Sequence, residues 1–309
     1  MKNLLGLLFV FMLLVSCDDG NVTVQDISFE DVAAANCGQI VYKVKNNEIL
    51  LLKMSDLVLA FTNDVTLPNQ PRIFSIGSSN SVSYRAYNGA ASGDNICGSP
   101  PATKPDVIEE WKATGGTIEI TTTISRSTNT TTNATTIIGY NHFVVFRNVT
   151  FEKPSGSQFY DTFNFGFVKT SFTPLNLTFT NTAKVCLSGT NNIITNKIGS
   201  VVLMSYDNVP NNISSTLGVK TAAITSTNQL FYRVFGNIDP INYSCNATFP
   251  VSDNLQQEWK STSGTVEINT ETNGGTSLKH TITLKGVTLS KGNSTFYLGD
   301  SFNFGEYFN

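Results

Sequence analysis

Side chains able to bind a metal ion or to act as a general base are few in this chain of 309 residues. It contains two histidines, His142 and His280, one in each half. Each begins a run of alternating apolar residues, so both should face the buried side of a strand. We expect core histidines bonded to backbone carbonyls rather than metal ligands. Neither half has a second histidine or a free thiol to complete a zinc site, and we predict no cofactor.

Carboxylates recur in both halves and could in principle hydrolyse a glycosidic bond, which requires two of them. The recurring acids are Glu110, Glu119 and Asp161, then Glu258, Glu267 and Asp300. Strand alternation places Glu119 and Glu267 on a polar face, and no nucleophile-elbow motif surrounds a serine. We therefore expect a non-enzymatic protein and keep a glycan hydrolase as the weakest alternative.

A cation beside an aromatic ring can bind a planar or sugar-like ligand. The candidate ligand surface comprises Arg85, Tyr87, Trp111, Arg233, Phe235 and Trp259. In the competing interpretation, which we favour, each arginine pairs across the sheet with Glu119 or Glu267, and each tryptophan packs onto the sheet. The ligand surface requires the four aromatic side chains to be exposed to solvent.

These residues belong to two copies of one sequence pattern. Glu110-Trp111-Lys112 returns as Glu258-Trp259-Lys260, and Phe163-Asn164-Phe165-Gly166 returns as Phe302-Asn303-Phe304-Gly305. The offset between copies is 148 residues at the tryptophans and 138 at the histidines. A polar stretch at 125–135 accounts for the difference and suits an extended hairpin loop. We predict homologous domains at 26–171 and 175–309.

Period-two alternation dominates both copies, for example at Ile118 and Ile120, and predicts half-buried strands. With 40% apolar and 14% charged residues, a long helical or disordered chain is excluded. We predict an all-β protein of two tandem antiparallel β-sandwich domains, each with one short helix and one disulfide. The expected helices span Asp106–Lys112 and Asp253–Lys260, each with an aspartate at its start and a lysine at its end.

Four of the five cysteines fall into two similarly spaced pairs. Cys37 and Cys97 lie 60 residues apart, and Cys186 and Cys245 lie 59 apart. Four cysteines allow three pairings, but a single connectivity must serve both copies, so we expect a disulfide within each. The alternative is four reduced core cysteines, which an exported protein makes less favourable.

The fifth cysteine, Cys17, ends an apolar run that follows Lys2. This run of about 12 residues is too short to span a bilayer and has the layout of a secretory signal peptide. Leu14-Val15-Ser16-Cys17 resembles the lipobox of bacterial lipoproteins, and Asp18-Asp19 resembles the surface-export signal of Bacteroidota lipoproteins. The resemblance implies that residues 1–16 are removed, that Cys17 is acylated, and that 17–25 form a tether.

Together these features resemble tandem β-domain lipoproteins of the Bacteroidota. We expect a lipid-anchored protein of the outer membrane, on the cell surface or the periplasmic face, that binds or scaffolds without catalysis. Its partners would be the membrane, through the acyl chains, and a glycan or another envelope protein; a carbohydrate-binding accessory lipoprotein is the main alternative. The net charge of −3 offers no basic patch for nucleic acid.

Overall fold

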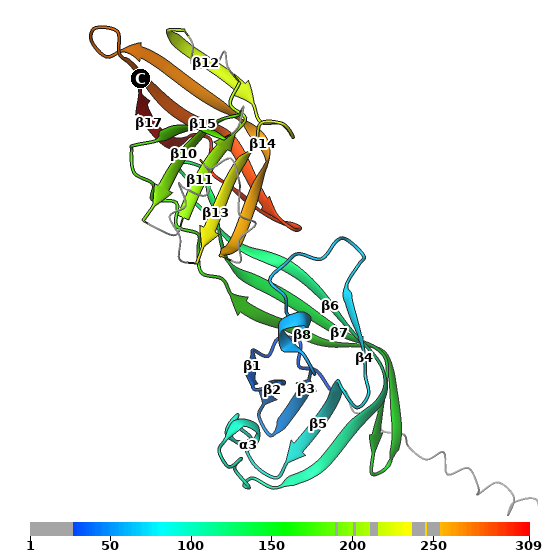
Figure 1. The fold of residues 1–309 in the computed structure, drawn as a ribbon. Coiled ribbons are helices and arrows are strands. Elements are labelled where there is room, and N and C mark those ends of the chain that lie inside the picture. The colour runs from blue at the N-terminus through cyan, green and yellow to red at the C-terminus, as the bar shows by residue number, and fades with distance from the viewer. Residues whose placement is uncertain (1–26, 189–190, 200–201, 211–215, 237–244, 246–253) are drawn as a thin grey trace, which may run out of the picture.

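A computed structural model describes residues 27–188, 191–199, 202–210, 216–236, 245 and 254–309. Each repeat forms one antiparallel sheet, and the two domains lie end to end (Figure 1). The predicted all-β architecture of two tandem domains is therefore confirmed. Cys17 and the proposed signal peptide lie outside the described residues.

The first sheet has eight strands in the order β1-β2-β3-β5-β6-β7-β8, with β4 paired to β6. These strands are β1 (Ala34–Cys37), β2 (Ile40–Lys45), β3 (Glu48–Lys53), β4 (Arg72–Ser75), β5 (Ser81–Tyr87), β6 (Val107–Thr128), β7 (Thr135–Lys153) and β8 (Gly156–Ser171).

The second sheet has nine strands in the order β16-β15-β14-β13-β11-β10-β9, with β12 paired to β14 and β17 to β15. These strands are β9 (Lys184–Ser188), β10 (Asn191–Ile198), β11 (Val202–Asp207), β12 (Gly218–Ala223), β13 (Leu230–Phe235), β14 (Leu255–Thr272), β15 (Leu278–Lys291), β16 (Ser294–Tyr297) and β17 (Phe302–Phe308).

The positions predicted for the helices were wrong. Apart from Asp106, the segment Asp106–Lys112 forms the start of β6, and the described part of Asp253–Lys260 forms the start of β14 from Leu255 on. Pairing with β5 and β13 overrides the helical spacing, because it places Trp111 opposite Tyr84 and Trp259 opposite Tyr232. The helices described over their whole length are α2 (Leu57–Ala60) and α3 (Asp94–Cys97), both in the first repeat, and Cys245 of the second repeat is also helical. None of the helices in that part of the chain is long and apolar enough to cross a membrane.

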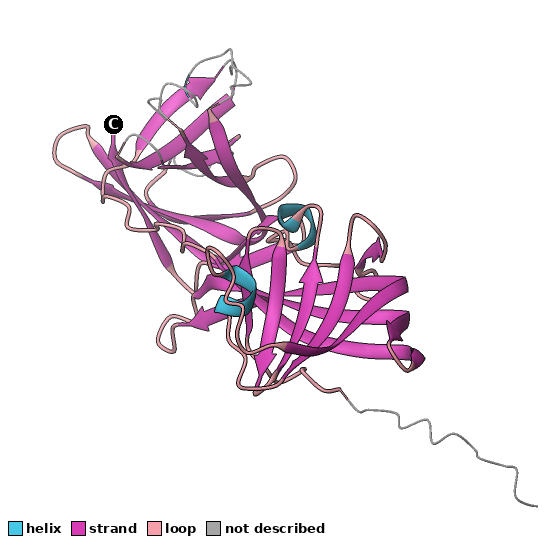
Figure 2. Cartoon of the chain, turned by 90° about the horizontal axis from the view of Figure 1, so that it is seen from below, coloured by secondary structure: helices cyan, strands magenta, loops and turns pink. Residues whose placement is uncertain are grey.

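Each sheet curls over so that its two halves enclose one hydrophobic core, as the curved strands of Figure 2 show. The bend lies at Gly116 in β6 and at Gly264 in β14, where the register shifts. Both glycines have positive φ, and a Cβ would lie 2.9 Å from the Cα of Val149 in the first repeat and 2.7 Å from that of Val287 in the second. Each glycine thus forms a bulge within one continuous strand.

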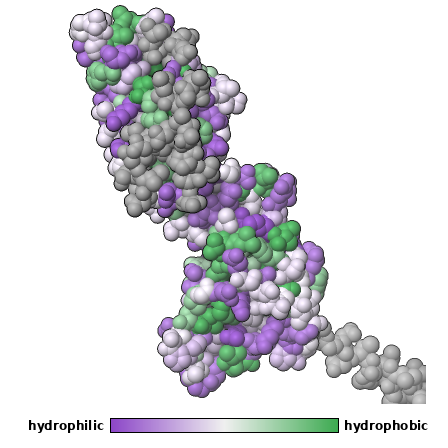
Figure 3. Space-filling view, viewed as in Figure 1, coloured by the Kyte–Doolittle hydropathy of each residue, from purple (hydrophilic) through white to green (hydrophobic). Residues whose placement is uncertain are grey.

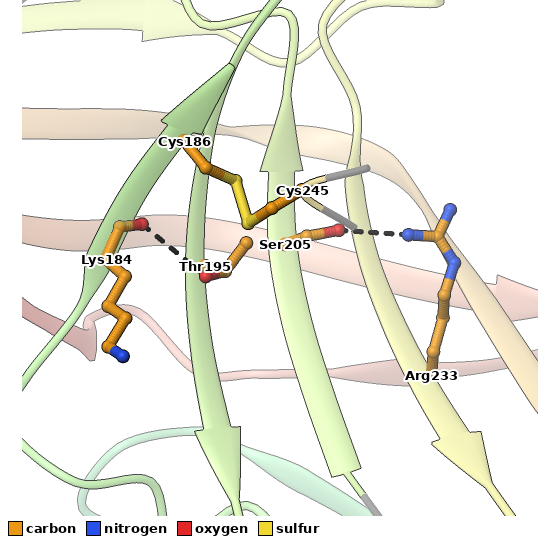
Figure 4. Close-up of a disulfide and its surroundings, with 6 residues drawn as sticks. All are labelled: Lys184, Cys186, Thr195, Ser205, Arg233 and Cys245. Atoms are coloured by element: carbon orange, nitrogen blue, oxygen red, sulfur yellow. Dashed lines mark hydrogen bonds between the residues drawn. A yellow bond between two sulfur atoms is a disulfide. The ribbon is translucent and has the colours of Figure 1, made fainter. Parts of the chain in front are cut away.

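Both predicted disulfides are confirmed. Cys37 at the end of β1 bonds Cys97 at the end of α3, with a Cα–Cα distance of 6.0 Å. Cys186 in β9 bonds Cys245 at a Cα–Cα distance of 5.5 Å (Figure 4). Closing a loop of this length stabilises each domain by up to about 4 kcal/mol in the chain-entropy model.

The second core includes side chains from the first repeat. Ile137 and Tyr140 of β7 are buried in it, and the Tyr140 hydroxyl donates to Ser294 Oγ at 3.1 Å. At the rim, Arg126 Nη2 donates to the carbonyl of Thr295 at 2.9 Å. The long β6–β7 hairpin therefore inserts into the neighbouring domain rather than ending in solvent.

We expect Ile137→Ala to destabilise the second domain by about 2–5 kcal/mol, the usual range for truncating a buried isoleucine. Ile138→Ala is the matched control, because Ile138 is the next residue and its side chain is 46% exposed. Hydrogen exchange during urea unfolding should show faster opening of β13–β15 in Ile137→Ala only. Equal exchange rates in the two variants would contradict the insertion of the hairpin into the second core.

Candidate ligand pocket

The aromatic residues of the predicted ligand surface are buried. Tyr87 is 3% exposed, Trp111 0%, Phe235 1% and Trp259 1%. Trp111 packs between Tyr84 and Phe151, and its Nε1 donates to Glu109 Oε1 at 2.7 Å. The prediction of a ligand surface on these aromatic residues was therefore wrong. The carbohydrate-binding alternative loses the side chains on which it depended.

The two arginines of that surface form ion pairs, but not with the predicted partners. Arg85 Nε lies 2.8 Å from Glu110 Oε1, and Arg233 Nε lies 2.8 Å from Glu258 Oε2. Register decides this, because β5 pairs with the part of β6 before the bend and places Arg85 opposite Glu110. Glu119 lies beyond the bend, where it bonds Arg147 instead.

Glu110 and Glu258 consequently stay ionised. Burial acts to raise the pKa of each carboxyl, but hydrogen bonds from the facing arginine and from Lys112 or Lys260 hold it below its ordinary value. A carboxylate fixed in this way is a poor general acid. The described residues contain no cluster of three or more His, Cys, Asp or Glu side chains able to hold a metal ion.

Both histidines are fully buried, as predicted. Their partners are side chains, however, and not the expected backbone carbonyls. His142 Nδ1 lies 2.8 Å from Thr122 Oγ1, and His142 Nε2 lies 3.0 Å from Thr170 Oγ1. In the second repeat, His280 Nδ1 lies 2.9 Å from Thr270 Oγ1 and Nε2 lies 3.0 Å from Asn309 Oδ1.

The hydrogen bonds fix the tautomer of each ring. Thr170 donates its hydroxyl proton to Asn63 Oδ1 at 2.6 Å, so His142 must donate from Nε2. Asn309 Oδ1 can only accept, so His280 also carries its proton on Nε2. Thr122 must then donate its hydroxyl proton to His142 Nδ1, and Thr270 must donate its own to His280 Nδ1.

In the first repeat these hydrogen bonds form a chain in which each side chain donates to the next. The guanidinium of Arg72 donates to Thr122 Oγ1, whose own proton goes to His142. Burial, and then the charge of Arg72, lower the pKa of His142 to about 4. Its single ring lone pair is occupied by Thr122, so His142 is arranged to position Thr170 and Asn63 rather than to accept a proton.

Thr170 and Asn63 line a pocket of about 460 Å³ at the surface of the first domain. The pocket is lined by Asn36, Val41, Leu57, Val58, Phe61, Thr62, Asn63, Val168, Lys169 and Thr170. Helix α2 forms one wall, with the side chain of Asp56 capping the helix through the N–H of Leu59 at 2.9 Å. Figure 3 shows apolar surface gathered on this face of the first domain. We call this cavity the first pocket.

A second pocket of about 240 Å³ lies at the matched place of the second repeat. It is lined by Val185, Asn192, Ile194, Val209, Pro210, Tyr307, Phe308 and Asn309. Strand register establishes the match, since Asn36 pairs with Val41 just as Val185 pairs with Ile194.

The facing walls of the two pockets also correspond. His142 lies opposite Val168, and His280 lies opposite Tyr307. Lys169 follows Val168 in the first pocket, and Phe308 follows Tyr307 in the second. The duplication has therefore preserved a pocket while its residue types diverged. Sequence reasoning missed the pockets because most of these positions do not share an identity.

We expect acid to destabilise the protein through His142. The pKa of the unfolded side chain is near 6.5, and in the folded protein it is about 4. Between these values only the unfolded chain takes up the proton. The free energy of unfolding should therefore fall as pH drops from 6.5 to 4, by up to about 1.4 kcal/mol per pH unit. Urea titrations of the native protein and of His142→Asn should show a shallower pH slope in the variant; equal slopes would refute this assignment.

Searches against family models, curated proteins and solved structures find no match for this chain.

Proposed function

We propose that this chain is a lipid-anchored lipoprotein of the bacterial cell envelope that binds a ligand in its two matched pockets without catalysing a reaction. The observation that carries the proposal is the recurrence of the pocket on the same strands of both sheets, beside the same buried histidine. The volume of the first pocket lies within the range of small-molecule sites.

Binding is favoured over catalysis by the chemistry of the polar groups at the pocket. His142 is neutral and has both ring nitrogens engaged. The proton of Thr170 is committed to Asn63, and no carboxylate lines the first pocket. A nucleophile would need a free base beside it, and these contacts provide none. The pocket can thus orient a ligand but has no group arranged to attack it.

The proposed membrane anchor is inferred from the sequence of the N-terminal residues. Acylation of Cys17 after removal of 1–16 would place the domains at the outer membrane, on its surface or periplasmic face. The partners would be the membrane and either a small envelope ligand or another envelope protein.

Binding can be measured with the neutral fluorescent probe N-phenyl-1-naphthylamine. Val58 lines the first pocket and is 83% exposed, so Val58→Asp should weaken probe binding there about tenfold without disturbing the core. Leu59→Asp is the matched control, because Leu59 lies on the same helix and is 57% exposed but does not line the pocket.

The second pocket has an equivalent pair of variants. Phe308→Asp should weaken probe binding, whereas Val219→Asp should not, since Phe308 is 55% exposed in the pocket and Val219 is 58% exposed outside it. Absence of probe binding to the native protein, or equal loss in each pair, would reject the proposed pockets.

The anchor is tested by Cys17→Ala. We expect the variant to incorporate no labelled fatty acid and to retain residues 1–16, because the lipoprotein peptidase acts on the acylated form. Mass spectrometry of the N-terminus and metabolic labelling in the native host measure this. Unchanged labelling in Cys17→Ala would rule out Cys17 as the acylation site.

A further inference from the structure

The two pockets differ in charge at one matched position. Lys169 of the first pocket is replaced by Phe308 in the second. No salt bridge or side-chain hydrogen bond within the described part of the chain engages the ammonium group of Lys169, and its side chain is exposed. An unpaired cation beside an apolar cavity is a suitable partner for an anionic group.

The nearby carboxylates of the described residues form no ion pair with Lys169. Glu30 and Asp31 line an adjoining hollow of about 340 Å³, which Lys169 also borders. Glu30 Oε2 accepts from Asn164 Nδ2 at 3.0 Å. The charges of both acids act on the buried ammonium of Lys43, whose pKa they raise against the larger opposing effect of burial. Lys169 therefore remains the cation available to a ligand.

An uncharged donor of the first pocket can also bind an anion. Asn63 Oδ1 already accepts the Thr170 proton, which leaves both N–H donors of the amide and one oxygen lone pair for a ligand. Thr170 is engaged by both Asn63 and His142. The Asn63 amide can therefore donate to a headgroup that Lys169 attracts.

The apolar side is suited to a hydrocarbon chain. Val41, Leu57, Val58 and Val168 contribute branched aliphatic side chains. The ring of Phe61 is 9% exposed and meets the ring of His142 edge-on, with centroids 5.4 Å apart, so it offers no broad face for stacking. A sugar ring would require such a face, whereas an alkyl chain needs only the apolar walls.

We propose that the first pocket binds an amphipathic anion, an alkyl chain that ends in a carboxylate or a phosphate. The chain lies against α2 and Val168, and the headgroup is bound by Lys169 and the Asn63 amide. The second pocket, with Phe308 in place of the cation, accepts apolar ligands without a preference for negative charge. This assignment rests on the proposed binding function and adds the chemical class of the ligand.

The test uses residues 17–309 with Cys17→Ala, so that no attached acyl chain competes for the pocket. Phe308→Asp is added to weaken binding in the second pocket. Decanoate, decyl phosphate, decanol and decyltrimethylammonium each compete with bound N-phenyl-1-naphthylamine below their micellar concentrations. We expect one or both anions to compete at least about tenfold more strongly than decanol, the usual gain from a charge-assisted hydrogen bond. The stronger of the two identifies the headgroup as carboxylate or phosphate.

Lys169→Met should reduce that preference to about onefold, with each competitor measured against the probe affinity of the variant itself. The control is Lys53→Met, which removes an exposed lysine of β3 outside both pockets. With Val58→Asp silencing the first pocket, Phe308→Lys should give the second pocket a preference for anions. Probe binding without any anion preference, or a preference that survives Lys169→Met, overturns the ligand class alone. Failure of the probe to bind either pocket overturns the proposed function as well.

Discussion

Each repeat depends on one constraint: a single sheet must curl until its first and last strands meet around the core. In the second repeat the backbone closes this seam, with Ala183 N–H donating to Glu306 O and Glu306 N–H donating to Asn181 O, both at 2.7 Å. In the first repeat a side chain crosses the seam instead, where Asn164 Nδ2 of β8 donates to Glu30 Oε2 at 3.0 Å. The Lys43 ammonium donates to the carbonyls of Phe29 and Glu30 at 3.0 and 3.1 Å. Buried carbonyls must be satisfied, and the two repeats satisfy them differently.

The same position supplies the buried donor in both repeats. Lys43 corresponds to Asn196, whose Nδ2 donates to the carbonyls of Thr180 and Phe304 at 2.7 and 2.6 Å. Each donor lies against the glycine of a Phe-Asn-Phe-Gly segment: a Cβ on Gly166 would be 2.8 Å from Lys43 Nζ, and one on Gly305 would be 2.9 Å from Asn196 Nδ2. This accounts for the repeated glycine. Burial lowers the pKa of Lys43 to about 8, so the first repeat carries a costly charge where the second carries a neutral amide.

Local pattern and repetition were enough to predict the duplication, the strand-rich fold, the cysteine pairing and the burial of both histidines. Features set by strand register were not predictable. Val107 and Trp111 have helical spacing, yet pairing with β5 makes their segment a strand. The partner of Arg85 depends on which side of the Gly116 bend faces it. The pockets left no repeated motif, since Asn36 corresponds to Val185, and the shared Thr122 and Thr270 beside the histidines were the sole sequence trace.

The longer hairpin of the first repeat explains why the two copies are not interchangeable. The open end of the first core is covered by its own residues, with Lys153 Nζ 4.8 Å from the centroid of the Trp111 ring and bonded to Gln158 Oε1. In the second repeat Phe296 takes the place of Gln158, and the Trp259 ring packs against Phe296. The second repeat thus has an apolar surface where the first has a polar cover, and the β6–β7 hairpin of the first repeat packs on that surface. Because this contact buries side chains of both repeats in one core, both pockets belong to one interlocked unit. Two sites held in this way can bind one partner together only if the spacing of the partner's two binding groups fits the spacing of the pockets.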